Sequence, residues 1–309
     1  MKKILRVLWG WMKGLFSFSD PETPVNDKDE TTDSEGDLEG FDPNFLPVSL
    51  ELPILADTEA PLLNYRHFSV AVNPARRMPY YTAVNIDAER YNKLKDQIPT
   101  RKEIGDDNWV LDKRIPKSIQ LPESFYKDND FDLGHMVRRE DVLWGENVEQ
   151  ALAANDDTFY LTNATPQHKD FNRNAERWKG LEDYALKNAR KNNLRVSVFS
   201  GCVFDEKDRK FKEVQIPGKF WKILIIVKPD GELSATGYIV QQDDLIEDIT
   251  ERGGFSYEQF KTYQVPISRI EAATGLQFQL NDYDPLQKMG IRGSEMQPSA
   301  IDDYADIVF

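Results

Sequence analysis

The sequence predicts an α+β fold with a largely antiparallel sheet flanked by helices. An apolar run from Phe220 to Val227 ends at a Pro-Asp-Gly turn, and a second apolar run follows from Leu233 to Val240. Two such runs joined by a tight turn predict an antiparallel hairpin. Residues 67–72 and 80–86 form a similar pair of strand-like runs around a turn. Residues 181–192 have the composition of a helix, so helices accompany the sheet.

Length and composition fit one large or two small globular domains. The chain has 309 residues, of which 40% are hydrophobic. Cys202 is the only cysteine, so no intrachain disulfide can form, and a reducing, cytoplasmic location is favoured. Three histidines and one cysteine argue against a structural zinc site. The net charge of −14 predicts that binding to duplex nucleic acid is modest and strongly dependent on salt.

Residues 1–19 predict an amphipathic helix. At 100° per residue, ten apolar residues fill one broad face, and Trp9, Trp11 and Phe16 are among them. The segment holds four basic residues and no acidic residue, and its apolar run is too short to span a bilayer. Three interpretations are open: attachment to a membrane surface, docking on a protein partner or a second subunit as in a homodimer, or an atypical export signal.

The remainder of the chain divides into three parts. Residues 20–42 hold ten acidic residues, one basic residue and few apolar ones, so they predict a disordered acidic linker. Residues 43–286 contain the strand and helix patterns and form the expected globular domain. Residues 287–309 have few apolar residues and predict a tail. His67 lies at a strand start, where it is expected to satisfy hydrogen bonds.

The central stretch carries the chemistry. It begins with Asp132-Leu133-Gly134-His135, in which the glycine predicts a tight turn before the histidine. A short strand is expected at 158–161 and a turn-rich loop at 163–167, followed by a helix that begins at 171–174 and carries Glu182. One histidine, several asparagines and one glutamate on these elements predict a hydrolytic site with one metal ion.

These motifs resemble the DNA/RNA non-specific endonucleases, the ββα-metal (His-Me finger) group that includes endonuclease G-like enzymes. The family pattern is Asp-Arg-Gly-His, then Thr/Ser-Asn-x-x-Pro-Gln, then Asn-x-x-x-Trp-x-x-Leu-Glu. The chain has Asp-Leu-Gly-His at 132–135, Thr-Asn-Ala-Thr-Pro-Gln at 162–167, and Asn174, Trp178, Leu181 and Glu182 at the family's spacing. The resemblance covers residues from about 65 to 286, and Leu133 stands where the family usually has arginine.

The resemblance implies a ββα-metal fold and a metal-dependent endonuclease that hydrolyses DNA, RNA or both with little sequence specificity. His135 would be the general base, since neutral imidazole accepts a proton near pH 7. Asn174 would bind one Mg²⁺ or Mn²⁺ through a neutral oxygen, which suits a hard cation that keeps most of its waters. The spacing along an α-helix would place Glu182 on nearly the same side as Asn174, where it would hold those waters. Asn163 would support the site. The candidates for phosphate contact are Arg138, Arg139 and Arg173.

Several alternatives remain open at this point. Asn172 competes with Asn174 as the metal ligand, although its spacing to Trp178 fits less well. An upstream arginine, such as Arg101 or Arg114, could also reach the phosphate. The whole chain could instead be a catalytically weak nucleic-acid-binding or scaffold module tethered by its N-terminal helix. A metal-dependent phosphodiesterase for a smaller substrate is the third interpretation.

Overall fold

A computed structural model describes residues 38–55, 59–105, 107–173, 178–228, 230–242, 262–290 and 299–300. The predicted N-terminal helix, the linker up to residue 37 and residues 301–309 therefore lie outside the described residues. None of the helices within the described ranges is both long enough and apolar enough to cross a membrane.

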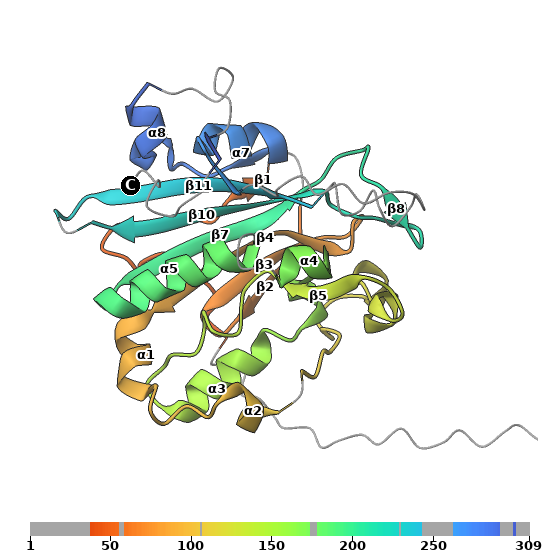
Figure 1. The fold of residues 1–309 in the computed structure, drawn as a ribbon, viewed down its shortest axis with the longest axis horizontal. Helices are drawn as coiled ribbons and strands as arrows, with labels where there is room; N and C mark the ends of the chain where they lie inside the picture. Colours follow the sequence, from red (N-terminus) through yellow and green to blue (C-terminus); the bar gives the residue numbers. More distant parts are fainter. Residues whose placement is uncertain are drawn as a thin grey trace, which may run out of the picture. The chain divides into compact units, whose positions relative to one another are not determined.

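One antiparallel sheet organises the domain, as the sequence predicts (Figure 1). Its order is β14-β12-β11-β10-β7-β4-β3-β2, and every neighbouring pair is antiparallel. The strands are β2 (Leu62–Tyr65), β3 (Phe68–Asn73), β4 (Met78–Asp87), β7 (Arg195–Val203), β10 (Lys219–Val227), β11 (Leu233–Gln241), β12 (Thr262–Val265) and β14 (Ser299–Ala300). Both predicted hairpins, β3–β4 and β10–β11, are thereby confirmed.

Helices cover both faces of this sheet (Figure 1). On one side lie α7 (Ile267–Thr274) and α8 (Pro285–Lys288), and on the other side lie α4 (Lys169–Asn172) and α5 (Trp178–Asn192). The remaining helices are α1 (Ala88–Leu94), α2 (Arg101–Ile104) and α3 (Val148–Asp157). Alternation along β10 sends Phe220 and Leu224 into the core on the α5 side, and Trp221 and Ile223 into the core on the α7 side.

A two-stranded antiparallel sheet and two helices lie beside the main sheet. β5 (Phe131–His135) pairs antiparallel with β6 (Ala164–His168), and α4 and α5 follow. The predicted glycine turn before His135 and the loop at 163–167 were wrong, because both segments are strands. A Cβ at Gly134 would lie 2.3 Å from the side chain of Gln167, so the glycine permits close pairing rather than a turn. The strand predicted at 158–161 was also wrong, since a turn and the 3₁₀ helix η4 (Leu161–Asn163) occupy that region.

The expected domain boundaries shift at both ends. Residues 38–42, assigned to the acidic linker, pack on the sheet: Phe41 is buried, and the backbone N–H of Gly40 donates to the carbonyl of Tyr65 at 3.0 Å. Within the expected C-terminal tail, Ser299 and Ala300 form β14, the edge strand beside β12. In both places the backbone gains hydrogen-bond partners that composition alone does not reveal.

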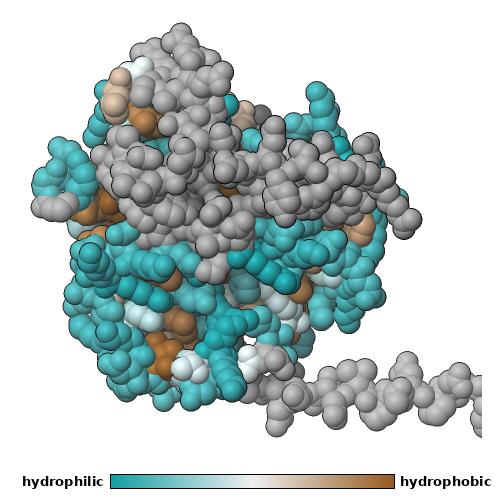
Figure 2. Space-filling model, viewed as in Figure 1, coloured by the Kyte–Doolittle hydropathy of each residue, from teal (hydrophilic) through white to brown (hydrophobic). Residues whose placement is uncertain are grey.

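The face of the molecule that Figure 1 presents is mostly hydrophilic over the described residues (Figure 2). Hydrophobic residues appear there in small, separated groups. Four large hydrophobic residues are exposed among the described residues: Ile54, Leu62, Val110 and Met289. Scattered apolar residues of this kind are ordinary for a folded domain.

Candidate active site

A cleft of about 650 Å³ is lined by residues of β5 and of the segments around it, and by residues of α4 and α5. Five of the seven predicted site residues line it: His135, Glu182, Arg138, Arg139 and Arg173. The other described residues that line it are Arg101, Asp107, Trp109, Glu123, Asp132, Leu133, Glu140 and Asn172. Asn163 lies behind the cleft, and Asn174 falls outside the described residues.

His135 ends strand β5 and forms part of the cleft wall. Its ring packs 4.5 Å from the ring of Trp109 and 5.1 Å from that of Phe159, measured between centroids. Within the described part of the chain, its Nε2 has no hydrogen-bond partner. Burial, with nearby arginines that include Arg101 and Arg139, lowers the pKa of His135 to about 3. The imidazole is therefore neutral at pH 7 and able to accept a proton.

Asn163 fixes the backbone that follows His135. Its Oδ1 accepts from the N–H of Val137 at 2.9 Å, and its Nδ2 donates to the carbonyls of Val137 and Thr158, each at 2.9 Å. The carbonyl of Asn163 also accepts from the N–H of Met136 at 3.0 Å. The side chain is fully buried, so its place is beneath the catalytic segment and outside the cleft.

Glu182 points from α5 toward the sheet and forms a buried ion pair. Its Oε1 accepts from Nζ of Lys222 at 2.9 Å, and its Oε2 lies 3.4 Å from Nε of Arg138. Burial raises the pKa of Glu182, while Lys222 and Arg138 pull it down. Sequence reasoning missed Lys222. The available signal was a single lysine at an alternate position of an apolar strand, on the face that β10 turns toward α5.

Two of the three predicted phosphate-binding arginines are committed to carboxylates. Nη2 of Arg138 donates to Asp183 at 3.0 Å, and its Nε faces Glu182. Arg173 binds Asp132 through Nε at 2.8 Å and Nη2 at 2.5 Å, and 70% of its side chain is exposed. A phosphate would have to displace or share the partners of Arg173. At Arg138 it could reach Nη1, which makes no hydrogen bond to the described residues.

Arg139 is placed differently. Its side chain is buried at the cleft, and its Nη1 makes no hydrogen bond to the described residues. The carboxylate of Asp107 lies 4.0 Å from that nitrogen. Burial and the neighbouring Arg101 lower the pKa of Arg139. A guanidinium with an unused donor suits an anion that enters the cleft.

The oxygen ligands that line the cleft suit a hard divalent cation. Carboxylates of Asp132 and Glu182 and the amide of Asn172 provide oxygen, the ligand that Mg²⁺ and Mn²⁺ prefer. The amide nitrogen of Asn172 donates to Asp132 at 3.0 Å. Among the described residues no group of three or more His, Cys, Asp or Glu side chains could hold a metal. A cation bound by few protein ligands keeps most of its waters.

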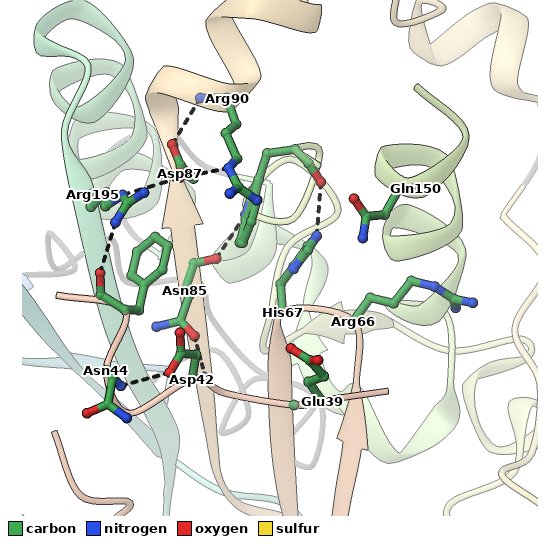
Figure 3. Close-up of a pocket in the computed structure, with 13 residues that line it drawn as sticks. Glu39, Asp42, Asn44, Arg66, His67, Asn85, Asp87, Arg90, Gln150 and Arg195 are labelled. Atoms are coloured by element: carbon green, nitrogen blue, oxygen red, sulfur yellow. Dashed lines mark hydrogen bonds and ion pairs between the residues drawn. The ribbon is translucent and has the colours of Figure 1, made fainter. Parts of the chain in front are cut away.

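A second polar cavity, of about 340 Å³, lies at the ends of strands β4 and β7 and differs in its electrostatics (Figure 3). Arg90 and Arg195 lie within 3.7 Å and 3.3 Å of Asp87, respectively. Nε2 of His67 is 2.9 Å from the carbonyl of Trp144, which confirms the expected structural role of this histidine. Burial lowers the pKa of His67 to about 4. Asp87 thus faces two of the arginines of this cavity.

Two other proteins are similar in sequence to this chain over half of its length or more. The uncharacterized protein y4fB of Sinorhizobium fredii is 39% identical over 265 residues, which cover 78% of the chain and 39% of that protein. Human mitochondrial endonuclease G is 30% identical over 165 residues, which cover 50% of each. The chain thus spans half or less of the length of these two relatives.

A solved structure and a family model are also similar to this chain. The crystal structure of the EndoG/EndoGI complex superposes with a TM-score of 0.54 at 21% identity, over 73% of this chain and 88% of that one. At this identity the similarity concerns the fold, and it confirms the predicted α+β class. The model of the DNA/RNA non-specific endonucleases matches residues 53–284, which include every predicted site residue. The chain belongs to the DNA/RNA non-specific endonuclease family.

Proposed function

We propose that the chain is a metal-dependent endonuclease that hydrolyses phosphodiester bonds of DNA, RNA or both. One observation supports this most directly. The neutral His135, whose Nε2 has no hydrogen-bond partner among the described residues, shares one cleft with the unused guanidinium nitrogen of Arg139. A base and an anion-binding donor are the two groups that attack of water on a phosphodiester requires.

His135 acts as the general base. It takes a proton from the attacking water, which requires the neutral form that the ring has at pH 7. The lowered pKa also makes the ring a weaker base than a free imidazole. Trp109 and Phe159 fix the ring orientation, and Asn163 fixes the backbone that follows the strand. The base is thereby held in one geometry before substrate arrives.

Arg139 binds the phosphate and offsets its charge. Nη1 of its buried guanidinium makes no hydrogen bond to the described residues, and its ion-pair contact with Asp107 is long, at 4.0 Å, so this nitrogen can form a charge-assisted hydrogen bond to the phosphate. Arg173 acts more weakly, because Asp132 already engages its guanidinium. Arg138 can contribute through Nη1 alone, because Asp183 engages its Nη2 and Glu182 faces its Nε. Contacts of this kind read the backbone rather than the bases, so little sequence specificity is expected.

Asn174 and Glu182 are the residues that would hold the metal and its waters. A bound Mg²⁺ or Mn²⁺ would stabilise the charge that develops on the phosphate and on the leaving 3′ oxygen. Glu182 is suited to orient water because Lys222 and Arg138 fix its carboxylate in place.

The test is cleavage of plasmid DNA and of RNA by purified protein, with Mg²⁺ and with EDTA. His135→Ala should lower the rate by about 10²–10⁴-fold, the usual contribution of a general base. His67→Asn is the matched control, since His67 is a buried histidine outside the cleft. A scaffold module would cleave neither substrate, and a small-substrate phosphodiesterase would cleave only a model diester.

We further propose that residues 1–19 attach the nuclease to a membrane surface or to a protein partner. The support is the sequence, with ten apolar residues on one helical face and four basic residues beside them. Deletion of residues 1–19 should leave cleavage of free DNA unchanged and release the protein from membranes or from its assembly. Fractionation and size-exclusion chromatography separate these cases, and equal behaviour of both forms contradicts the proposal.

A further inference from the structure

The cleft has an apolar part beside His135. Among the described residues that line it, Trp109 and Leu133 are the two apolar ones, and the others are charged or polar. Trp109 is half-buried, so part of its indole is open to the cleft. Its ring lies 4.5 Å from that of His135, at an interplanar angle of 48°.

The position of Trp109 is fixed by the chain around it. The N–H of Val110 donates to the carbonyl of Phe159 at 3.0 Å, and the N–H of Leu161 donates to the carbonyl of Val110 at 2.8 Å. The ring of Phe159 meets the indole edge-on at 5.4 Å. The indole is therefore held in one position, so it loses little conformational entropy when a ligand packs on it.

Leu133 adds a second apolar group close by. It lies two residues before His135 on β5, so both side chains are on the same face of that strand. Leu133 packs partly against a neighbouring hydrophobic cluster of buried residues. Its remaining surface lines the cleft. An aliphatic side chain makes no hydrogen bond to phosphate, so this part of the cleft suits an apolar, planar group.

We propose that Trp109, together with Leu133, forms a nucleobase subsite on which the base next to the scissile phosphate stacks. This inference rests on the proposed function, since it needs Arg139 to hold the phosphate. Every base has a π-face, so stacking on an indole binds nucleic acid without selecting sequence. A base that stacks on Trp109 has left its neighbours in the strand, so the subsite favours unpaired strands over duplex.

The test separates binding from catalysis. In the His135→Ala background, fluorescence anisotropy measures the Kd for a short thymidine strand and for the same sugar–phosphate chain built from abasic tetrahydrofuran units. The base-bearing chain should bind about 5- to 150-fold more tightly, the range for one to three kcal/mol of stacking. Trp109→Leu should remove most of that difference, and Trp109→Phe should retain most of it. Val110→Ala, a neighbour outside the cleft, is the matched control and should change neither Kd.

Two results would overturn the subsite. One is that the protein binds both chains equally. The other is that Trp109→Leu weakens both chains by the same factor, which would mean that the indole only maintains the shape of the cleft and does not contact a base. A thymidine–adenine duplex should bind more weakly than the single strand, and Trp109→Leu should narrow that gap. If the wild-type protein fails to cleave nucleic acid with Mg²⁺ while base-dependent binding persists, the proposed function fails and the subsite stands.

Discussion

Nζ of Lys222 lies 2.9 Å from a carboxylate oxygen of Glu182, and both side chains are buried between β10 and α5. This pair joins the central sheet to the wall of the cleft. The other carboxylate oxygen faces Arg138 at 3.4 Å. Glu182 is thus held from two sides, which restricts its carboxylate to one orientation.

Lys222→Met should destabilise the protein strongly. Removal of one partner from a buried ion pair leaves an uncompensated charge and typically costs about 3–5 kcal/mol of unfolding free energy. Arg138 still neighbours Glu182, so we expect the lower end of that range. Urea denaturation measures it. The control is Lys93→Met, which breaks the exposed pair with Glu89 and should change little; equal losses in the two variants would contradict a special role for Lys222.

Cleavage should not depend on the ordinary titration of histidine. Because the pKa of His135 is lowered to about 3, the ring stays neutral as pH falls from 8 to 5. We therefore expect kcat/KM, measured with saturating Mg²⁺, to show no half-maximal loss near pH 6.5. A profile that loses half its value at that pH would show that His135 titrates normally or is not the base.

Arg139→Met should impair substrate binding more than Arg173→Met. The loss of a hydrogen bond to a charged group is worth about 1.5–3 kcal/mol, or roughly 10- to 150-fold in kcat/KM. Arg173 is exposed and engaged by Asp132, so its loss should have a smaller effect. Steady-state kinetics on a defined oligonucleotide provide the comparison. The assignment of the phosphate contact to Arg139 is wrong if the order of the two variants is reversed.

His67→Asn should weaken the dependence of stability on acid pH. The pKa of His67 is about 4 in the folded protein and about 6.5 in the unfolded chain. Between these values the unfolded chain binds the extra proton, so the unfolding free energy falls as pH drops from 6.5 to 4. The slope from this one group is at most about 1.4 kcal/mol per pH unit.

Urea denaturation of both proteins at several pH values isolates this contribution, because other titrating groups act in both. Asparagine tolerates the left-handed backbone of residue 67, where φ is 70°. Parallel stability curves for the two proteins would contradict the assigned pKa shift.

The sheet was predictable because its strands carry long apolar runs. Residues Phe220–Val227 and Leu233–Val240 are continuous in sequence, and their turn is marked by Pro229-Asp230-Gly231. The β5–β6 pair of the candidate site was not predictable from local pattern. Gly134 and Pro166 usually mark turns, yet each lies within a short strand of a two-stranded sheet, where such residues are tolerated.

The contents of the cleft were only partly predictable. Ordered motifs brought His135 and Glu182 together, and the structure places both in one cleft. The partners of the arginines depend on contacts between residues far apart in sequence, such as Arg138 with Asp183. Which guanidinium remains unused cannot be read from a list of arginines, because it depends on where each carboxylate lies.

Strands β4 and β7 pair side by side, yet residues 88–194 lie between them in sequence, and every described residue that lines the cleft belongs to that segment. Such long-range pairing slows folding, because a long loop must close before its contacts form. During synthesis the cleft residues leave the ribosome before strand β7, the partner of β4. Lys222 leaves the ribosome later still. A nascent chain that ends before β10 therefore has every proposed catalytic residue but lacks the cation that anchors Glu182. This order of synthesis would delay the proposed nuclease activity until the domain is complete.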